Sequence, residues 1–459
     1  MPVGEQTAIN LFNKVNKSCK AYQKFLKINS IKPSSINSFS EYTSLPLINK
    51  RNYLETFPIE ERLCSGTELS DYYMLCTSSG STGEPTIWPR SYENDKRVIS
   101  LNKKMYEALF KINDKKTLVV VTFGLGAWTA GMLTSRLCWE SSPENKLSVV
   151  TPGLDKVVAL NVIKKMSPYY NHTIITGYPP FIVELLEYGA EHNFDFKTIN
   201  TKIHYTSSRV SEGLRTEMLK RISKTGKRHD VLGFYACSET GIIGIETPEL
   251  ADVLEVAFHH RTLCEELFHD PNPPTLVEYN PKVKFIEIVN DHIVISADQP
   301  IPLVRFDMGD RGGLLTGNEV ILAAKKHGIN LSPSLREKFL LFVHGRVDSV
   351  RILNNVYIDD IMYCLEKSKF ANRFSGNFQY GLEHVGLKPR LLVHVHLKEG
   401  KKMTKAEQEF FIDEMYKNLL KVNPDFRMVQ QGIKIERFKV KFLPDDPNKY
   451  KSGKFKYFL

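Results

Sequence analysis

The run TLVVVT at residues 117–122 is the strongest indication of the fold, because it is the first of several short apolar runs that alternate with helical patterns. Similar runs occur at residues 147–151, 173–176 and 202–206, each followed by sequence with helix-like spacing. This alternation is typical of βαβ units, whose strands form a parallel sheet buried under helices. We therefore predict an α/β fold with ligand-binding loops at the carboxyl ends of these strands.

The chain becomes strand-rich beyond about residue 280. Residues 285–289 and 292–296 read as two strands joined by Asn290 and Asp291, a plausible hairpin turn. The last segment, 350–459, reads as a small α+β unit with an alternating strand at 391–397, a capping box at Thr404 and Glu407, and an amphipathic helix at 405–420.

Two N-terminal segments precede these units. Residues 8–28 carry apolar side chains at helical spacing and predict a single amphipathic helix. Residues 34–52 are rich in Ser and Asn with single apolar anchors, which predicts a connector that wraps the surface.

Composition narrows the class of protein. The chain has 459 residues, 42% of them hydrophobic and 25% charged, which predicts two or three soluble globular domains. The net charge of +10 comes from lysines spread along the chain, which favours a solvated basic surface over a nucleic-acid interface. No signal peptide or run of about 18 apolar residues is present, so we expect no membrane partner. Seven scattered cysteines without a CxxC motif predict free thiols and a cytoplasmic location.

A Ser/Gly-rich loop, TSSGSTGEP at residues 77–85, follows an apolar-aromatic run. Glycines let backbone amides approach an anion and hydroxyl groups add donors, so the loop suits a polyphosphate. It is not a Walker loop, since no Gly-Lys-Ser/Thr follows, and an ordinary turn remains the alternative.

A second motif, GFYACSETG at residues 233–241, offers an aromatic ring for a purine and two hard oxygen ligands, Ser238 and Glu239, for Mg²⁺. A core strand that ends in a turn is the alternative. Further along, PLVRFDMGD at 302–310 places Asp310 where a carboxylate could accept both hydroxyls of a ribose, although Asp307 and Asp310 could equally be turn residues.

Two more polar segments follow. In HGRVDS at 344–349, Arg346 can pair with phosphate or ribose and Asp348 could be a hinge. Near the C-terminus, Lys454 stands beside a glycine, where a lysine could swing into a site and neutralise a carboxylate and a phosphate; a merely solvated lysine cluster is the alternative.

Together, and in this order, these segments resemble the acyl-adenylate-forming superfamily of acyl-CoA ligases, peptide-synthetase adenylation domains and luciferases. The segment SEYTSLPLINKRNYL at 40–54 is similar to the Leu-Pro-x-x-x-Lys segment of the phenylacetate-CoA ligase branch. The resemblance covers residues 40–454. It implies an AMP-binding domain at 1–345, with its strand-rich part at about 280–343, a hinge at 346–349 and a C-terminal lid domain at 350–459.

The resemblance also implies roles for single residues. Asp310 would bind the ribose hydroxyls with help from Arg346, Asp348 would be the pivot, and Lys454 would be the adenylation lysine. Ser238 and Glu239 would contact ATP and Mg²⁺, while Gly233, Phe234 and Tyr235 would border adenine. The phosphates would lie on the loop formed by Thr77, Ser78, Ser79, Gly80, Ser81, Thr82 and Gly83.

The implied reaction is ATP-dependent activation of a carboxylic acid to acyl-AMP with release of pyrophosphate, followed by transfer to CoA. Transfer to a carrier-protein thiol, a protein or an amine is the alternative, and a non-catalytic ATP-binding protein is a third. Three departures from the family pattern bear on this choice: Glu84 in the phosphate loop, Arg209 beside adenine, and Asn354 with Asn355 at the hinge, where a side chain could narrow a pantetheine tunnel.

An acyl pocket would be bounded by segments at the ends of the predicted strands. Its aromatic and small residues suit an aryl or medium-sized apolar acid, and the absence of an aspartate from 123–129 disfavours an α-amino acid. A core position is the alternative for Trp128. The predicted lining is Phe123, Gly124, Trp128, Tyr178, Ser207, Ser208 and Ala236.

One further cluster, His259, His260, Cys264 and His269, raises the question of structural zinc. Its spacing matches no standard zinc pattern, and we regard coincidence as the better interpretation.

Overall fold

The structure is a computed structural model, and it describes residues 4–33, 36–78, 86–207, 209–346, 349–351, 355–385, 388–398, 400–423, 426–427 and 436–444. These residues form two compact units. The first comprises the described residues of 1–78, 86–178 and 189–345, and the second those of 179–188 and 346–459.

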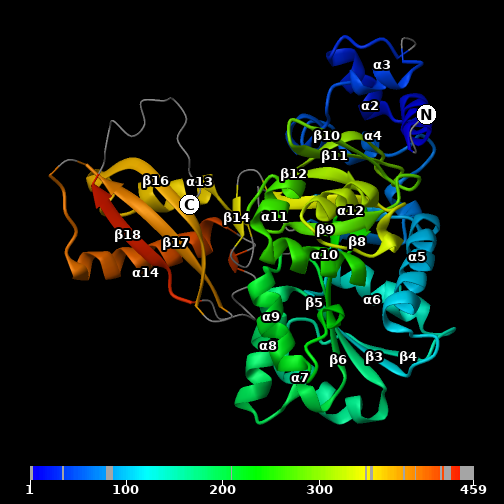
Figure 1. The fold of residues 1–459 in the computed structure, drawn as a ribbon. Helices are drawn as coiled ribbons and strands as arrows, with labels where there is room; N and C mark the ends of the chain where they lie inside the picture. Colours follow the sequence, from blue (N-terminus) through cyan, green and yellow to red (C-terminus); the bar gives the residue numbers. More distant parts are fainter. Residues whose placement is uncertain are drawn as a thin grey trace. The chain divides into compact units, whose positions relative to one another are not determined.

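An eleven-stranded mixed sheet forms the centre of the first unit as described (Figure 1). In order across the sheet, its strands are β10 (Phe285–Val289), β11 (His292–Ala297), β12 (Leu303–Thr316), β13 (Phe339–Arg346), β9 (Thr275–Tyr279), β8 (Gly241–Ile245), β7 (Val231–Cys237), β6 (Thr201–Tyr205), β5 (His172–Gly177), β3 (Thr117–Thr122) and β4 (Leu147–Val150).

The parallel half of the sheet confirms the predicted α/β fold. Strands β4, β3, β5, β6 and β7 pair in parallel, and every residue of β3 and β5 is buried. Apolar runs without alternation therefore form these strands, as expected for a sheet covered on both faces. The helices along this part of the chain are α5 (Tyr92–Phe110), α6 (Thr129–Ser141), α7 (Lys156–Met166), α8 (Pro179–Glu191) and α9 (Glu212–Ile222).

Strand β7 is where the sheet changes from parallel to antiparallel. Its first residues, 231–233, pair with β6 in parallel, whereas residues 234–237 pair with β8 in the antiparallel sense. The GFYACSETG motif therefore begins at this change of direction and ends in the turn between β7 and β8.

The antiparallel half is covered on both faces. Leu340 and Leu341 are adjacent on β13 but belong to different apolar clusters. The cluster of Leu340 includes residues of α10 (Pro248–His259), α11 (Arg261–Phe268) and α12 (Gly317–Lys326), and the cluster of Leu341 includes residues of the N-terminal helices. Successive side chains of a strand point to opposite faces, so the two clusters cover opposite faces of the sheet. The predicted hairpin is confirmed as β10 and β11, with φ of 51° at Asn290 and 66° at Asp291.

The N-terminal segment differs from both predictions made for it. The single helix is broken at Cys19, whose extended backbone separates α1 (Glu5–Ser18) from α2 (Lys20–Ile28). Both helices bury apolar side chains in the cluster that faces β10–β12. The chain between them and the first strand includes α3 (Phe39–Thr43) and α4 (Ile59–Arg62).

The segment 34–52 differs from the predicted surface connector only in how deeply its anchors pack: its described polar side chains are largely exposed, as predicted, whereas Tyr42 and Ile48 are fully buried. Backbone bonds tie Ile48 to Arg305 and Asp307 on β12. The buried Arg305 side chain forms a two-bond ion pair with Glu287 and donates to the carbonyls of Thr43 and Leu45. Arg305 holds this contact at φ 54°, a left-handed conformation that is uncommon for arginine.

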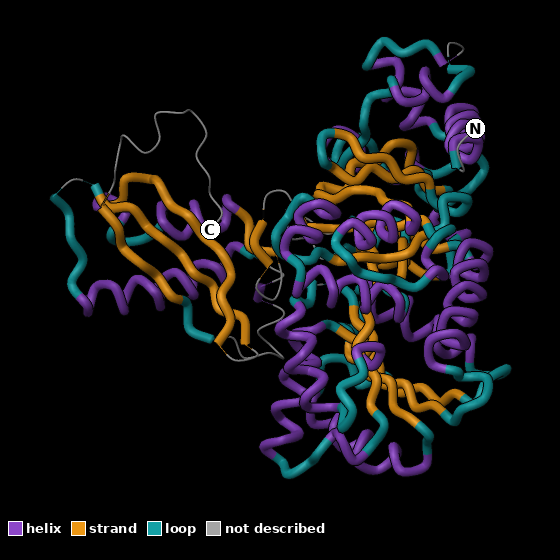
Figure 2. Tube along the Cα trace, in the orientation of Figure 1, coloured by secondary structure: helices purple, strands orange, loops and turns teal. Residues whose placement is uncertain are grey.

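The second unit contains a three-stranded sheet and two helices that contact each other and the sheet (Figure 2). The predicted capping box is confirmed at Thr404 and Glu407, at the start of α14. The elements described in this unit are β14 (Ser349–Arg351), β15 (Asn355–Tyr357), α13 (Ile358–Glu366), β16 (Phe374–Val385), β17 (Lys388–Leu397), α14 (Lys405–Val422) and β18 (Lys439–Pro444).

Candidate functional site

Tyr235 and Asp310 are 75 residues apart in the sequence, and the fold brings their side chains into contact. The Tyr235 hydroxyl donates a hydrogen bond of 2.6 Å to Oδ2 of Asp310. Three strands separate β7 from β12 in the sheet, so a flat sheet would hold them roughly 19 Å apart at about 4.8 Å per step. The contact therefore requires a curved sheet, in which these two strands face each other across the concave side.

Phe234 lies on the other face of β7. Its ring is buried and packs on His204, with the ring centroids 4.5 Å apart. Burial in this apolar layer lowers the pKa of His204 to about 3, so the imidazole is neutral. Of the two aromatic residues predicted to border a purine, only Tyr235 thus shares a site with Asp310.

Ser238 and Glu239 lie in the turn between β7 and β8, and both are half-buried. Cys237 precedes the turn, where burial and then the nearby charge of Glu239 raise the pKa of its thiol to about 12. Gly241 ends the turn at φ 71°, a conformation that favours glycine. Ala236, a predicted pocket residue, pairs with Ile242 next to a bulge in the strand pair.

Backbone hydrogen bonds fix the residues on both sides of the predicted phosphate loop. Strands β1 (Met74–Thr77) and β2 (Ile87–Arg90) pair antiparallel, and the Ser78 amide donates to the Thr86 carbonyl at 2.9 Å. The Thr77 amide donates to Ala127 at 2.7 Å, which places the loop base beside the segment that follows β3.

The predicted acyl-pocket residues of this unit follow neighbouring parallel strands. Phe123 comes directly after β3, Tyr178 after β5, and Ser207 shortly after β6. Carboxyl ends of parallel strands meet at one edge of a sheet, so these positions share an edge. Phe123 and Tyr178 are buried, whereas Trp128 is half-buried and its ring lies against Gly124.

Close packing explains why the residue at position 233 is a glycine. A Cβ at this position would lie 2.9 Å from the Tyr205 ring, too close for any side chain. Its amide donates to Glu246 at 2.7 Å, and Glu246 in turn accepts from Arg215 at 2.6 Å. Arg215 and Glu246 form a buried charged network behind β7 that our sequence analysis missed, because nothing local distinguishes these residues from other charged ones.

Arg209, Arg346 and Asp307 also lie within the described residues. The Arg209 guanidinium group donates to the Pro273 carbonyl. Arg346 ends β13 and is exposed. Asp307 supports a turn, since it accepts from the Gly309 amide at 2.8 Å and contacts His292 at 3.0 Å. Outside the described residues lie Ser79, Gly80, Ser81, Thr82, Gly83, Glu84, Ser208, Asp348, Asn354 and Lys454.

The four residues of the possible zinc cluster are all described, and they do not form a metal site. Cys264 is buried in the apolar cluster of α10–α12, and His269 ends α11 at φ 55°. Nowhere in the described ranges do three or more His, Cys, Asp or Glu side chains gather in a way that could hold a metal ion.

Comparison with known proteins yields no matching family model and no matching curated sequence. Solved structures do match. A 2-hydroxyisobutyryl-CoA ligase in complex with 2-HIB-AMP and CoA, in the thioesterification state, aligns with 99% of this chain and 89% of its own, with a TM-score of 0.65 and 13% identity. The same ligase in the postadenylation state with 2-HIB-AMP aligns over the same shares with a TM-score of 0.55 and 13% identity.

An open conformation of that ligase with 2-HIB-AMP and CoA covers 100% of this chain and 90% of its own, with a TM-score of 0.53 and 12% identity. The chain thus has the fold of an acyl-CoA ligase, as the sequence resemblance predicts. None of the described helices is long and apolar enough to cross a membrane.

Proposed function

We propose that this chain is an AMP-forming ligase that joins a carboxylic acid to the α-phosphate of ATP and releases pyrophosphate. The hydrogen bond between Tyr235 and Asp310 carries the proposal, because it unites the residues expected to bind the two halves of adenosine. A tyrosine ring can stack on the purine. A carboxylate can accept several hydrogen bonds, so the bond from Tyr235 is compatible with bonds from the ribose hydroxyls to Asp310. The fold shared with a ligase crystallised with 2-HIB-AMP and CoA supports the same function.

Magnesium fits the donor chemistry of the β7–β8 turn. Ser238 and Glu239 offer hard oxygen ligands, and both are partly accessible. When bound, Mg²⁺ would neutralise phosphate charge. The remaining tasks fall to the chain: Asp310 orients the ribose, Thr77, Ser78 and the loop after them hold phosphates, and Lys454 neutralises the reacting carboxylate and the α-phosphate.

The second half of the reaction is also part of the proposal. We place a hinge at 346–349, with Asp348 as pivot and Arg346 beside the ribose, and a lid domain at 350–459. CoA is the proposed acceptor, in the manner of phenylacetate-CoA ligases. A carrier-protein thiol, a protein or an amine is the second candidate, which an asparagine at position 355, where relatives usually have glycine, favours.

The acid is proposed to be aryl or medium-sized and apolar. Phe123, Trp128 and Tyr178 provide aromatic surface at the shared edge of the parallel strands. The segment 123–129 contains no acidic residue that could pair with the amine of an amino acid.

A pyrophosphate-release screen tests the function directly. The purified chain is incubated with ATP, Mg²⁺ and a panel of aryl, alkyl and amino acids, with and without CoA. We expect release with one class of apolar acid, and consumption of CoA if CoA is the acceptor. Absence of acid-dependent release across the panel, together with absence of MgATP binding, would contradict the proposal.

Substitution Tyr235→Phe is expected to weaken MgATP binding by about 3- to 10-fold, because it removes one hydrogen bond to a carboxylate, worth about 1 kcal/mol net, and retains the ring. Isothermal titration calorimetry in the absence of acid measures the effect. The matched control is Tyr279→Phe, on β9, which should bind MgATP as the natural chain does. Equal affinities for Tyr235→Phe and the natural chain would show that the hydrogen bond to Asp310 does not contribute to nucleotide binding.

A further inference from the structure

A buried lysine, Lys284, lies against the β7–β8 turn, and the function proposed above gives it no role. Its side chain is only 5% exposed. Its Nζ donates to the carbonyl of Thr240 at 2.8 Å and to the carbonyl of Ile242. Thr240 follows Glu239 directly in the chain, so the ammonium group holds the backbone next to the proposed magnesium ligand.

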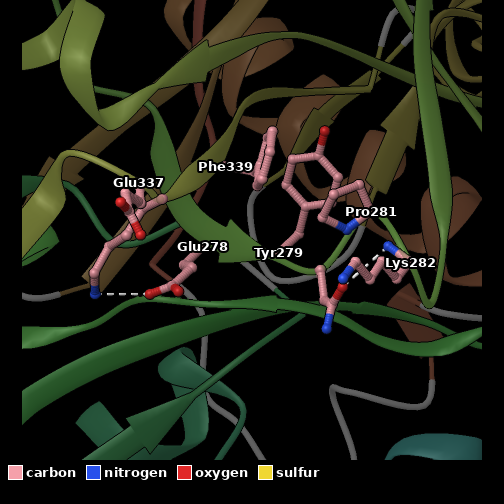
Figure 3. Close-up of a pocket in the computed structure, with 8 residues that line it drawn as sticks. Glu278, Tyr279, Pro281, Lys282, Glu337 and Phe339 are labelled. Atoms are coloured by element: carbon pink, nitrogen blue, oxygen red, sulfur yellow. Dashed lines mark hydrogen bonds and ion pairs between the residues drawn. The ribbon is translucent and has the colours of Figure 1, made fainter. Parts of the chain in front are cut away.

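A surface turn determines where this lysine points. The Asn280 carbonyl accepts from the amides of Val283 and Lys284 at 3.0 and 3.2 Å, which closes the turn just before β10. The outer side of this turn borders a hollow of about 200 Å³, where Lys282 lies (Figure 3). The Lys338 ammonium, which also lines that hollow, is paired with Glu278 at 2.7 Å. Lys284 is different, because it turns inward and is buried.

Another buried cation lies among the neighbours of Lys284. It forms no ion pair with any carboxylate in the part of the chain that the structure describes. A second buried cation, Arg90 on β2, lies close enough to repel it. Arg90 pairs with Asp95 on α5, but the same carboxylate also binds Arg136 on α6 at 3.2 Å. One buried carboxylate thus serves two arginines, and Lys284 has none.

The side chains of Arg90 and Lys284 both lie beside the end of the β7–β8 turn where β8 begins. A Cβ at Gly241 would be 3.7 Å from Nη2 of Arg90, so this guanidinium group lies beside the end of the turn. The Nε atom of Arg90 is buried and has no hydrogen-bond partner among the described residues. Two buried cationic side chains, Arg90 and Lys284, therefore lie beside the turn.

Keeping an unpaired ammonium group out of water is expensive, of the order of several kcal/mol. Burial lowers the pKa of Lys284 to about 8, which still leaves the group mostly charged at pH 7. A folded chain gains from such a charge when an anion binds nearby, because the attraction is only weakly screened in a buried setting. A nucleotide polyphosphate at the Ser238–Glu239 turn would be such an anion.

We infer that Lys284 is a positioning residue for the polyphosphate end of the nucleotide: its two carbonyl bonds fix the Ser238–Gly241 turn, and its buried charge favours a phosphate anion bound there. The inference rests on the proposed function. It predicts an effect on ligands that carry phosphates and none on adenosine, and it predicts that loss of the charge alone weakens phosphate binding while both carbonyl bonds remain.

The test compares Lys284→Met with the natural chain in calorimetric titrations of MgATP, magnesium pyrophosphate and adenosine, without any acid. We expect MgATP and pyrophosphate to bind about 10-fold more weakly, the effect of one unit charge roughly 10 Å away at an effective dielectric constant of 20. Adenosine binding should be unchanged. The control is Lys282→Met, which removes an exposed lysine of the same turn and should leave all three affinities as they are.

The outcomes separate the two proposals. If the natural chain does not bind MgATP, the proposed function fails. If it binds MgATP and Lys284→Met binds equally well, or loses adenosine affinity to the same degree, the inference on Lys284 is overturned while the function stands.

A pH series on the natural chain covers the case in which Lys284→Met does not fold. Between pH 7 and 9 the amine loses its charge but keeps two N–H donors for its two carbonyls, so MgATP affinity should fall while adenosine affinity does not. Burial raises the pKa of the neighbouring Cys237 thiol to about 12, so this thiol stays neutral across the range. The groups that face Lys284 are Arg90, Asp95, Arg136, Cys237 and Glu239. A constant ratio of the two affinities across this range would also overturn the inference.

Discussion

Substitution of Asp310 by alanine is expected to lower kcat/KM for ATP in pyrophosphate release by about 10²- to 10⁴-fold. In the proposed site the carboxylate accepts both ribose hydroxyls, and hydrogen bonds to a charged group contribute about 1.5–3 kcal/mol each. The substitution also removes the acceptor that holds the Tyr235 hydroxyl, so the aromatic half of the site loses its anchor. Steady-state kinetics with the best acid from the screen measures the loss.

Two further variants make this experiment specific. Asp310→Asn retains one acceptor oxygen without the charge, and we expect a loss between that of alanine and none. Asp298→Ala removes a carboxylate whose ion pair with Lys14 is exposed, and it should leave the kinetics unchanged. If Asp310→Ala keeps its KM for ATP within about twofold of the natural value, Asp310 does not bind the ribose.

The largest effect on stability is expected for Arg215→Met, with a free energy of unfolding about 3–5 kcal/mol lower. Arg215 is 1% exposed and bonds to Glu246 at 2.6 Å, while its Nε lies 3.3 Å from Glu212. Its removal leaves the buried carboxylate of Glu246 without its cation, whereas Glu212 keeps its ion pair with Arg228. Glu246 also accepts from the Gly233 amide, so the loss should loosen β7 where the sheet changes direction.

Thermal unfolding followed by circular dichroism checks this prediction. The midpoint should fall by roughly 6–20 °C, at about 2–4 °C per kcal/mol for a domain of this size. Lys220→Met is the matched control, because it breaks an exposed ion pair with Glu217 on the same helix and should shift the midpoint very little. Similar midpoints for the two variants would show that the buried network does not stabilise this unit.

Features that depend on local periodicity could be predicted from the sequence. The buried runs at 117–122 and 173–176, the hairpin through Asn290 and Asp291, and the capped helix after Thr404 all read directly from neighbouring residues. The break at Cys19 could not be seen, because apolar spacing continues across it and only the extended backbone there separates the two helices.

Contacts set by the curvature of the sheet could not be predicted either. Residue types at Tyr235 and Asp310 suggested a nucleotide, but their contact depends on strands that lie four places apart in the sheet. Phe234 and Tyr235 are neighbours in the motif, yet alternation along β7 sends them to opposite faces. Lys284 sits among other lysines of a surface turn, and only its burial distinguishes it.

The contacts of Arg305 with Glu287 and with the carbonyls of Thr43 and Leu45 have a consequence for how the chain folds during synthesis. The N-terminal helices and the segment at 42–48 find their partners on β10–β12, more than 230 residues later in the chain. At about 5–20 residues per second, a ribosome needs on the order of tens of seconds to supply those strands. During that interval the apolar side chains of the N-terminal helices have no native partner to pack against. Chaperone dependence during synthesis should therefore depend on the first 60 residues of this protein.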